Sequence, residues 1–354
     1  MAWNDLIGTQ LGQYTIIEEL GRGGSSRVYR AHDANLGRDV AIKVIQNDSD
    51  DRVGFVRRFQ RELQAVAKLD HPNIVPVYDQ GETQDFVYLV MQCVNGGTFR
   101  QRLGAPLPVR EAAMAACQMA QALHHAHTHG IIHRDVKPSN MLVDSEDPNH
   151  LLLTDFGIAK LQGMRGLTRT GTTIGTPEYM SPEQAEGKDI DPRADIYSLG
   201  CVIYESLTGR PPFVGSTPVS VLYQQVHSRP PYLRGFNPQA PRELVHIIEQ
   251  ALAKQPEERF GTADAFAEAL APFTVERVAA ADPDMIPTEM LDGRVVQTGG
   301  LPRDTLTGQY PVTGDLPPLM VAVDSSPAPA AGWEGLGTEG LDAIFPHDPE
   351  AQAH

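Results

Sequence analysis

The sequence has 354 residues, with 45 acidic against 29 basic side chains, a formal net charge of −16 and three cysteines. At about 150 residues per domain, this length predicts roughly two domains, each large enough to bury a core. A charge this negative argues against a general nucleic-acid binder and against docking on an anionic membrane, because both need a basic surface. Cys93, Cys117 and Cys201 are odd in number and widely spaced, which argues against a disulfide framework and a structural zinc site.

The chain carries no sequence signal for export or for membrane insertion. Its first residues include an acid and lack the apolar core of a signal peptide. No apolar run approaches the roughly 18 residues that a membrane span requires. We therefore expect a cytoplasmic protein without a membrane span.

The negative charge is concentrated in the last 80 residues. Residues 275–354 hold 13 acids, 3 bases, 10 prolines and 9 glycines, whereas residues 1–274 have a net charge of only −6. Segments with low hydrophobicity, many charges and frequent helix breakers do not offset the entropy of ordering. We therefore expect residues 275–354 to form a disordered acidic tail.

The body begins with short apolar runs that are typical of strands. The predicted strands are residues 14–19, 26–32, 39–45, 74–80 and 86–93, which are rich in Val, Ile and Tyr. Between the third and the fourth, Phe55, Phe59, Leu63 and Val66 recur at helical spacing, which predicts a helix over residues 52–69. After residue 97 the pattern turns helical, and the predicted helices are residues 109–129, 195–208, 241–254 and 262–270.

A glycine-rich segment, residues 20–28, lies between the first two predicted strands. Glycines allow backbone amides to approach phosphate oxygens, although such a segment is more often only a turn. A dinucleotide-binding fingerprint would need a helix to follow, and a P-loop would need Gly-Lys followed by Ser or Thr. Here Val28-Tyr29-Arg30 continues as a strand, so neither of these two motifs fits.

Lys43 interrupts an otherwise apolar predicted strand. A lone lysine is usually a surface residue, but this chain has only six lysines against 23 arginines. A buried ammonium is costly unless it is paired. Glu62 falls on the apolar face of the predicted helix, so we expect a Lys43–Glu62 ion pair that aims the ammonium at the phosphates of a nucleotide.

Charged groups cluster in two further segments, His133-Arg134-Asp135 through Asn140 and Asp155-Phe156-Gly157. With these residues, the sequence resembles the eukaryotic-like (Hanks-type) protein serine/threonine kinases, most closely those of bacteria, over about residues 11–272. It is similar to the kinase domain of the PASTA-receptor kinases, without their transmembrane and PASTA regions. Other matching positions, in chain order, are Gly21, Gly23, Val28, Ala41, Lys43, Glu62, Ser181, Pro182, Glu183, Asp195 and Arg259.

The resemblance implies the bilobal α+β protein-kinase fold over residues 11–274, followed by the tail. The N-lobe, about residues 11–95, is expected to be small and β-rich with one regulatory helix. The C-lobe, about residues 96–274, is expected to be larger and helical.

The resemblance also implies the roles of the side chains at the site. Asp135 accepts or orients the proton of the substrate hydroxyl, Lys137 neutralises the γ-phosphate, and Lys43 with Glu62 completes the catalytic set. Asn140 and Asp155 supply oxygen ligands for Mg²⁺, with Mn²⁺ as an alternative ion. The residues expected to hold ATP are Leu20, Gly21, Arg22, Gly23, Gly24, Ser25, Ser26, Val28, Ala41, Lys43, Met91 and Cys93. Ser26 departs from the family pattern by replacing the third loop glycine, from which we expect a tuned affinity for ATP.

Residues 155–183 form the activation segment by the same resemblance. We expect autophosphorylation at Thr168 and Thr170 to order it, because Arg134 beside the catalytic Asp offers a guanidinium to a phosphate. Glu183 and Arg259 are expected to form a buried ion pair that braces this segment. Asp195 is expected to cap backbone amides of the catalytic loop.

The residues favour an active, non-specific protein serine/threonine kinase, and two alternatives remain open: a nucleotide-binding pseudokinase scaffold, and a self-phosphorylating adaptor that acts through its tail. The expected partners are protein substrates, with phosphothreonine-reading (FHA-type) domains and an N-lobe homodimer as further alternatives, and no nucleic acid. A histidine-rich stretch invites a metal site, but imidazoles near a helix C-terminus are favourable to the helix dipole without one. We favour that simpler interpretation for His124, His125, His127, His129 and His133.

Overall fold

The computed structural model describes residues 6–23, 26–46, 52–156, 176–275, 288–291 and 294–297. The chain divides into two units, residues 1–282 and 283–354. Apart from residues 275, 288–291 and 294–297, the expected tail lies outside the described residues. The predicted division into residues 11–274 and 275–354 therefore stays a prediction.

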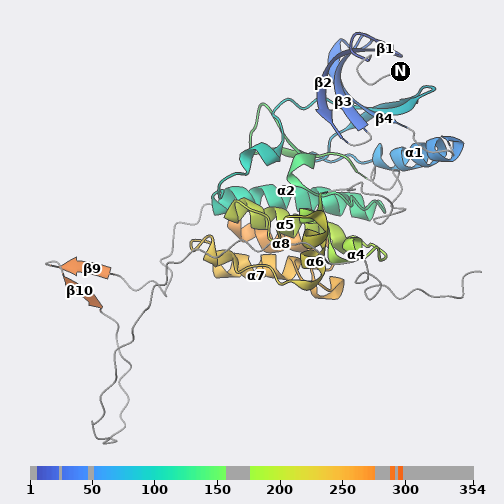
Figure 1. The fold of residues 1–354 in the computed structure, drawn as a ribbon. Coiled ribbons are helices and arrows are strands. Elements are labelled where there is room, and N and C mark those ends of the chain that lie inside the picture. Colours follow the sequence, from blue (N-terminus) through green and yellow to red (C-terminus); the bar gives the residue numbers. More distant parts are fainter. Residues whose placement is uncertain are drawn as a thin grey trace, which may run out of the picture. The chain divides into compact units, whose positions relative to one another are not determined.

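The N-terminal part of the first unit is an antiparallel sheet in the order β1-β2-β3-β4-β6-β5. Figure 1 shows the strands curled together at one end of this unit, with α1 beside them. The strands are β1 (Gln10–Leu11), β2 (Tyr14–Arg22), β3 (Ser26–Asp33), β4 (Arg38–Gln46), β5 (Val77–Glu82) and β6 (Phe86–Gln92). All five predicted strands are present, so a β-rich first lobe is confirmed. The fourth begins at Val77 instead of residue 74, since Ile74 forms only an isolated bridge to Leu153.

β4 is the centre of this lobe, because its residues from Val40 to Ile45 are all buried. One face of the sheet packs Tyr29, Ile42 and Val44 into an apolar cluster. The other face meets the helix α1 (Arg52–Val66). The apolar side chains of α1 that recur at helical spacing are buried, as the sequence predicted, and they are Phe55, Phe59, Leu63 and Val66.

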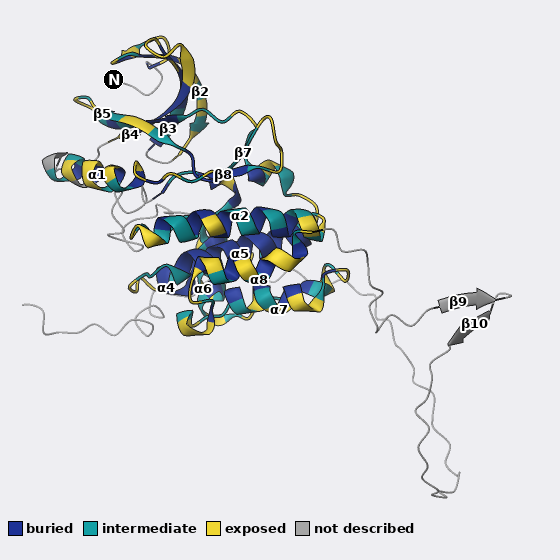
Figure 2. Ribbon diagram, turned by 180° about the vertical axis from the view of Figure 1, so that it is seen from behind, coloured by how far each residue is buried: buried dark blue, intermediate teal, exposed yellow. Residues whose placement is uncertain are grey.

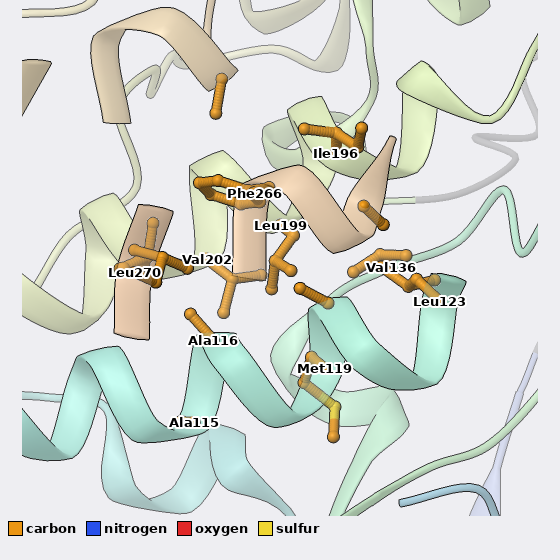
Figure 3. Packing of buried hydrophobic residues seen from close by; sticks show 14 of the residues in the cluster. Ala115, Ala116, Met119, Leu123, Val136, Ile196, Leu199, Val202, Phe266 and Leu270 are labelled. Atoms are coloured by element: carbon orange, nitrogen blue, oxygen red, sulfur yellow. The ribbon is translucent and has the colours of Figure 1, made fainter. Parts of the chain in front are cut away.

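The rest of the first unit is mainly helical. Its α-helices are α2 (Val109–Thr128), α4 (Pro182–Ala185), α5 (Arg193–Thr208), α6 (Pro218–His227), α7 (Arg242–Ala251) and α8 (Ala263–Leu270). Almost every residue of α5 is buried, and Figure 2 shows it as the dark blue centre of the helical lobe. α2 packs against α5 and α8 through its alanines, and these small side chains let the helices approach closely. Figure 3 shows residues of all three helices in one cluster.

Several elements escape the sequence pattern. The pattern did not predict a short antiparallel hairpin of β7 (Met141–Val143) and β8 (Leu151–Leu153), which is flanked by Asn140 and Asp155. α6 was not predicted because its apolar residues do not keep to one face: Val219 and Tyr223 are exposed whereas Val221 is buried. The second unit contains a further antiparallel pair, β9 (Thr288–Leu291) with β10 (Arg294–Gln297), which the composition did not predict.

Within the residues that the structure describes, no helix is both long enough and apolar enough to cross a membrane.

Candidate active site

A single buried carboxylate holds the backbone of the catalytic loop between α2 and β7. Asp195, near the start of α5, accepts hydrogen bonds from the backbone amides of His133 and Arg134, both at 2.8 Å. Its Oδ2 also lies 2.7 Å from Nε2 of His127. Arg134 has a φ of 68°, a left-handed conformation that side chains other than glycine adopt at a cost. The predicted cap by Asp195 is confirmed, and it holds this strained residue next to Asp135.

The side chains of Lys137 and Asn140 both contact the carboxylate of Asp135. The Lys137 ammonium lies 2.7 Å from Asp135 Oδ2, and Asn140 Nδ2 donates to the same oxygen at 3.0 Å. Asn140 also donates to the Asp135 carbonyl, within the short 3-10 helix η3 (Pro138–Asn140) that brings it back toward the loop. Asp135 remains about a third exposed, at 31% of its side chain, so a substrate group can reach its carboxylate.

The second polar pair joins the two lobes. Lys43 of β4 is buried and lies 2.8 Å from Oδ2 of Asp155, which follows β8 with a φ of 69°. Burial acts to raise the pKa of the Asp155 carboxyl, but the charge of Lys43 and its hydrogen bond outweigh it. The pKa of Asp155 is therefore held below its ordinary value, and the group is a carboxylate at neutral pH.

The predicted Lys43–Glu62 ion pair was wrong. Among the ion pairs of the described residues, Lys43 pairs with Asp155, and none joins it to Glu62. Glu62 lies half-buried on α1 and has an interaction of its own. Helical spacing indicated the face on which Glu62 lies, but not how far that helix stands from β4. Asp155 lies two residues after β8, and β8 is joined to the segment that leads into β5 by the Val75 amide, which donates to the Leu153 carbonyl at 3.0 Å.

The donor set around Asp155 and Asn140 fits a magnesium ion. Thr154, next to Asp155, donates its backbone amide to the Asn140 carbonyl at 3.0 Å, so the two segments run side by side. The Asn140 amide nitrogen is used on Asp135, which leaves its side-chain oxygen as the ligand atom. A carboxylate and an amide oxygen are hard ligands of the kind that Mg²⁺ prefers.

The glycine-rich segment forms the hairpin between β2 and β3. Gly21 pairs with Val28 in the β2–β3 register, and the Gly23 amide donates to the Ser26 carbonyl at 2.7 Å. Leu20 and Arg22 lie on β2 and are largely exposed. Gly24 and Ser25 lie outside the described residues. Ser26 therefore takes part in closing the hairpin through its backbone carbonyl.

Apolar side chains from both lobes meet beneath this hairpin. Ala41 and Met91 are register partners on β4 and β6 and are buried in one cluster with Leu152 of β8. The half-buried members of the cluster are Val28, Cys93, Val94 and Leu142. Val28, Ala41, Met91 and Cys93 were predicted from the sequence, but Leu142 and Leu152 were missed. The apolar runs around those two leucines were the available signal, and only the β7–β8 pairing shows that they line this cluster.

Cys93 carries a half-buried thiol directly after the end of β6. Its Sγ lies 3.3 Å from the Asn95 side-chain oxygen. Burial raises the pKa of the thiol, and Asp39 adds to the effect.

The polypeptide that leads from the site into α4 is fixed from several sides. Arg259 donates to both oxygens of Glu183, at 2.7 and 2.8 Å, and both side chains are buried, which confirms the predicted pair. Tyr179 donates to Glu205 of α5 at 2.5 Å, and Arg100 contacts both of them. Thr168, Thr170 and Gly157 lie outside the described residues.

The histidine-rich stretch serves structural contacts. His127 bonds to Asp195, and His133 Nε2 lies 2.8 Å from the Thr154 carbonyl. The rings of His125 and His129 contact each other in a tilted arrangement, with centroids 4.6 Å apart and an interplanar angle of 40°. In the described part of the chain, no group of three or more metal-ligating side chains converges.

Comparison with known proteins gives one consistent family. The protein kinase domain description matches residues 14–270. A probable serine/threonine-protein kinase of Streptomyces coelicolor is 44% identical over 264 residues, and serine/threonine-protein kinase PrkC of Bacillus subtilis is 42% identical over 262 residues. These stretches cover 72% and 73% of this chain but only 38% and 40% of the two relatives, so the chain spans about two fifths of their length. Among solved structures, the PknI kinase domain of Mycobacterium tuberculosis superposes with a TM-score of 0.61 at 32% identity, over 75% of this chain and 98% of that one.

Proposed function

The chain belongs to the protein kinase family, and from this premise we propose that it is a protein serine/threonine kinase that transfers the γ-phosphoryl group of ATP to protein hydroxyls. One observation carries the proposal: Asp135, Lys137 and Asn140 converge within hydrogen-bonding distance, close to the Lys43–Asp155 pair. Phosphoryl transfer needs charge neutralisation and positioning more than covalent catalysis. These two groups of side chains supply both.

The geometry divides the reaction between the two groups. Asp135 orients the acceptor hydroxyl and takes its proton as the hydroxyl oxygen attacks the γ-phosphorus and the bond to the leaving ADP oxygen breaks. Lys137, already beside Asp135, neutralises charge on the transferred group. Lys43 holds the phosphates of ATP on the N-lobe side. Asn140 and Asp155 hold Mg²⁺, or Mn²⁺ in its place, which when bound offsets the negative charge of the phosphates.

The nucleotide is proposed to lie between the glycine hairpin and the apolar cluster. The hairpin that joins β2 and β3 is proposed to cover its phosphates, and Ala41 and Met91 with Leu152 form an apolar surface for the adenine ring. The hairpin, Ala41 and Met91 belong to the N-lobe and Leu152 belongs to β8, and the Lys43–Asp155 ion pair joins these same two parts.

Activation by autophosphorylation at Thr168 and Thr170 is part of the proposal. Arg134 supports it, because its backbone is fixed by Asp195 directly beside Asp135. Protein substrates are the proposed partners, with FHA-type domains and N-lobe pairing as further proposals, and the proposed compartment is the cytoplasm.

Incubation of the full chain with γ-labelled ATP, Mg²⁺ and myelin basic protein tests the function. We expect label on the acceptor, and we expect Asp135→Asn to lower the rate by at least about 100-fold because the proton acceptor is lost. Asp147→Asn, an exposed carboxylate on the loop between β7 and β8, is the matched control and should change little.

The same experiment separates the alternatives. No label on any protein would contradict kinase activity and favour a nucleotide-binding scaffold. Label confined to residues 275–354 would favour a self-modifying adaptor. Mapping the labelled residues tests Thr168 and Thr170, and their absence among the sites would contradict the proposed activation.

A further inference from the structure

A chain of buried hydrogen bonds links α6 to the segment next to the catalytic loop. Gln225 of α6 has no exposed surface, and its side-chain Nε2 donates to the carbonyls of Pro177 and Glu178, at 3.0 and 2.8 Å. Its Oε1 accepts from the Tyr197 hydroxyl at 2.6 Å. Tyr197 in turn accepts from the Lys254 ammonium at 3.1 Å. Donors and acceptors alternate along this chain, so each bond fixes the direction of the next.

The two carbonyls that accept from Gln225 belong to the 3-10 helix η4 (Pro177–Tyr179). These two hydrogen bonds fix the backbone of η4 on the side that faces α6. A buried carbonyl costs free energy unless a donor meets it. Here a single amide meets two consecutive carbonyls, one with each of its hydrogens. No aliphatic side chain of the same length does so.

The far end of the same segment is tied to the catalytic loop. Ser181 and Gln184 form a capping box at the start of α4, and Gln184 Nε2 donates to the Arg134 carbonyl at 2.8 Å. Arg134 immediately precedes Asp135. The segment from Pro177 to Gln184 is thus held by one glutamine from α6 and holds the catalytic loop by another.

Resting on the proposed function, we infer that Gln225 is a positioning residue for the protein substrate: it sets the backbone of Pro177 and Glu178, and through it the surface beside Asp135 on which the acceptor chain lies. Its effect is on the acceptor and not on the nucleotide. The proposed ATP site is built from β2, β3, β4, β6 and the β7–β8 hairpin, whereas the side chain of Gln225 bonds to η4 and α5.

The test compares Gln225→Met with Gln224→Met in the full chain. Methionine keeps the length of glutamine without its donors. Gln224, the preceding residue of α6, bonds to Val214 and Ser220 carbonyls instead of to η4, so it is the matched control. Two rates are measured: phosphorylation of myelin basic protein with its KM, and ATP hydrolysis without an acceptor, by release of inorganic phosphate from fully autophosphorylated enzyme.

For Gln225→Met we expect kcat/KM for the acceptor to fall by about tenfold or more, mainly through KM, with the KM for ATP and the hydrolysis rate within about twofold of wild type. Gln224→Met should leave kcat/KM and KM for the acceptor, KM for ATP and the hydrolysis rate near their wild-type values. Gln225→His keeps one N–H donor and should restore part of the loss. If Gln225→Met does not fold, Gln225→His still carries the prediction, because one of the two carbonyls remains without its partner.

Equal losses in acceptor phosphorylation and ATP hydrolysis would overturn the inference, because they would mark Gln225 as a merely structural residue. An unchanged acceptor KM in both variants would also overturn it. Wild-type protein that phosphorylates no acceptor would instead contradict the proposed function itself, so the two failures are distinct.

Discussion

Replacing Arg259 by methionine tests how the helical lobe fixes the segment after η4. The Arg259 guanidinium has no exposed surface on its side chain and donates to Glu183 twice. It also donates to three backbone carbonyls, those of Ala253, Arg193 and Lys254, at 2.8 to 3.0 Å. Arg259→Met removes all five bonds and leaves the Glu183 carboxylate buried without its counter-charge.

The magnitude follows from what is left behind. Breaking a buried ion pair by removing one partner costs about 3–5 kcal/mol, because the remaining charge stays desolvated. For a domain of this size, roughly 2–4 °C in Tm corresponds to each kcal/mol, so we expect a fall of about 10 °C. The pair itself contributes less than this loss, since a well-packed apolar replacement of both partners is often neutral. We therefore expect Glu183→Met combined with Arg259→Met to recover a large part of the stability.

Circular dichroism is the assay, followed during thermal and urea unfolding. Arg193→Met is the matched control: its 2.6 Å pair with Asp191 is partly exposed, at 27% and 43%, and such pairs contribute about 0–1 kcal/mol. An Arg259→Met loss no larger than that of Arg193→Met, or a double variant no more stable than the single one, would refute the reasoning.

Two further predictions concern titrating groups. Lys43→Met should lower phosphoryl transfer by roughly 100-fold, and it should shift the acidic limb of the pH–rate profile to higher pH, because the Asp155 carboxyl loses the charge that lowers its pKa. Rates from pH 5 to 8 check this, and an unshifted limb in an active variant would contradict it. His71 has a lowered pKa because of burial and the nearby His125, and its Nδ1 accepts from the Asn73 amide, so the folded state favours the neutral ring. The unfolded protein then binds this proton more readily than the folded protein, so the free energy of unfolding should fall as the pH drops below about 6.5, the ordinary histidine pKa. Urea midpoints measured across this pH range should fall less steeply for His71→Gln than for wild type. Parallel pH dependences of the two proteins would show that His71 is not the group responsible.

The polar cluster at Asp135 could be located from the sequence because its members stand in one short local pattern. Asp135, Lys137 and Asn140 lie within six residues of one another, and one loop with a 3-10 turn suffices to bring them together. The apolar face of α1 and the strands of the first lobe are likewise properties of spacing along the chain. For such features, local chemistry and local geometry coincide.

What the sequence did not predict depends on distances between elements far apart in the chain. Lys43 takes Asp155 as its partner because of where β8 ends relative to β4, and the spacing on α1 holds no information about that distance. Gln225 reads as a polar residue on an unpredicted helix, and its role rests on the approach of α6 to η4 across nearly fifty residues. Polar residues that act through a tertiary contact carry no periodic signal.

The attachment of the catalytic loop to α5 has a consequence for turnover. Asp195 anchors His133 and Arg134 to the most deeply buried helix of the C-lobe, while Lys43 belongs to a separate sheet. One half of the site is thus anchored to a buried helix, and the other half, Lys43, lies on the N-lobe sheet and meets it through Asp155. We expect a separation of the lobes to lengthen the Lys43–Asp155 contact and to leave the contacts among Asp135, Lys137 and Asn140 unchanged, because those three lie in one loop. For the proposed kinase we therefore expect ADP to leave while the acceptor side of the site stays assembled.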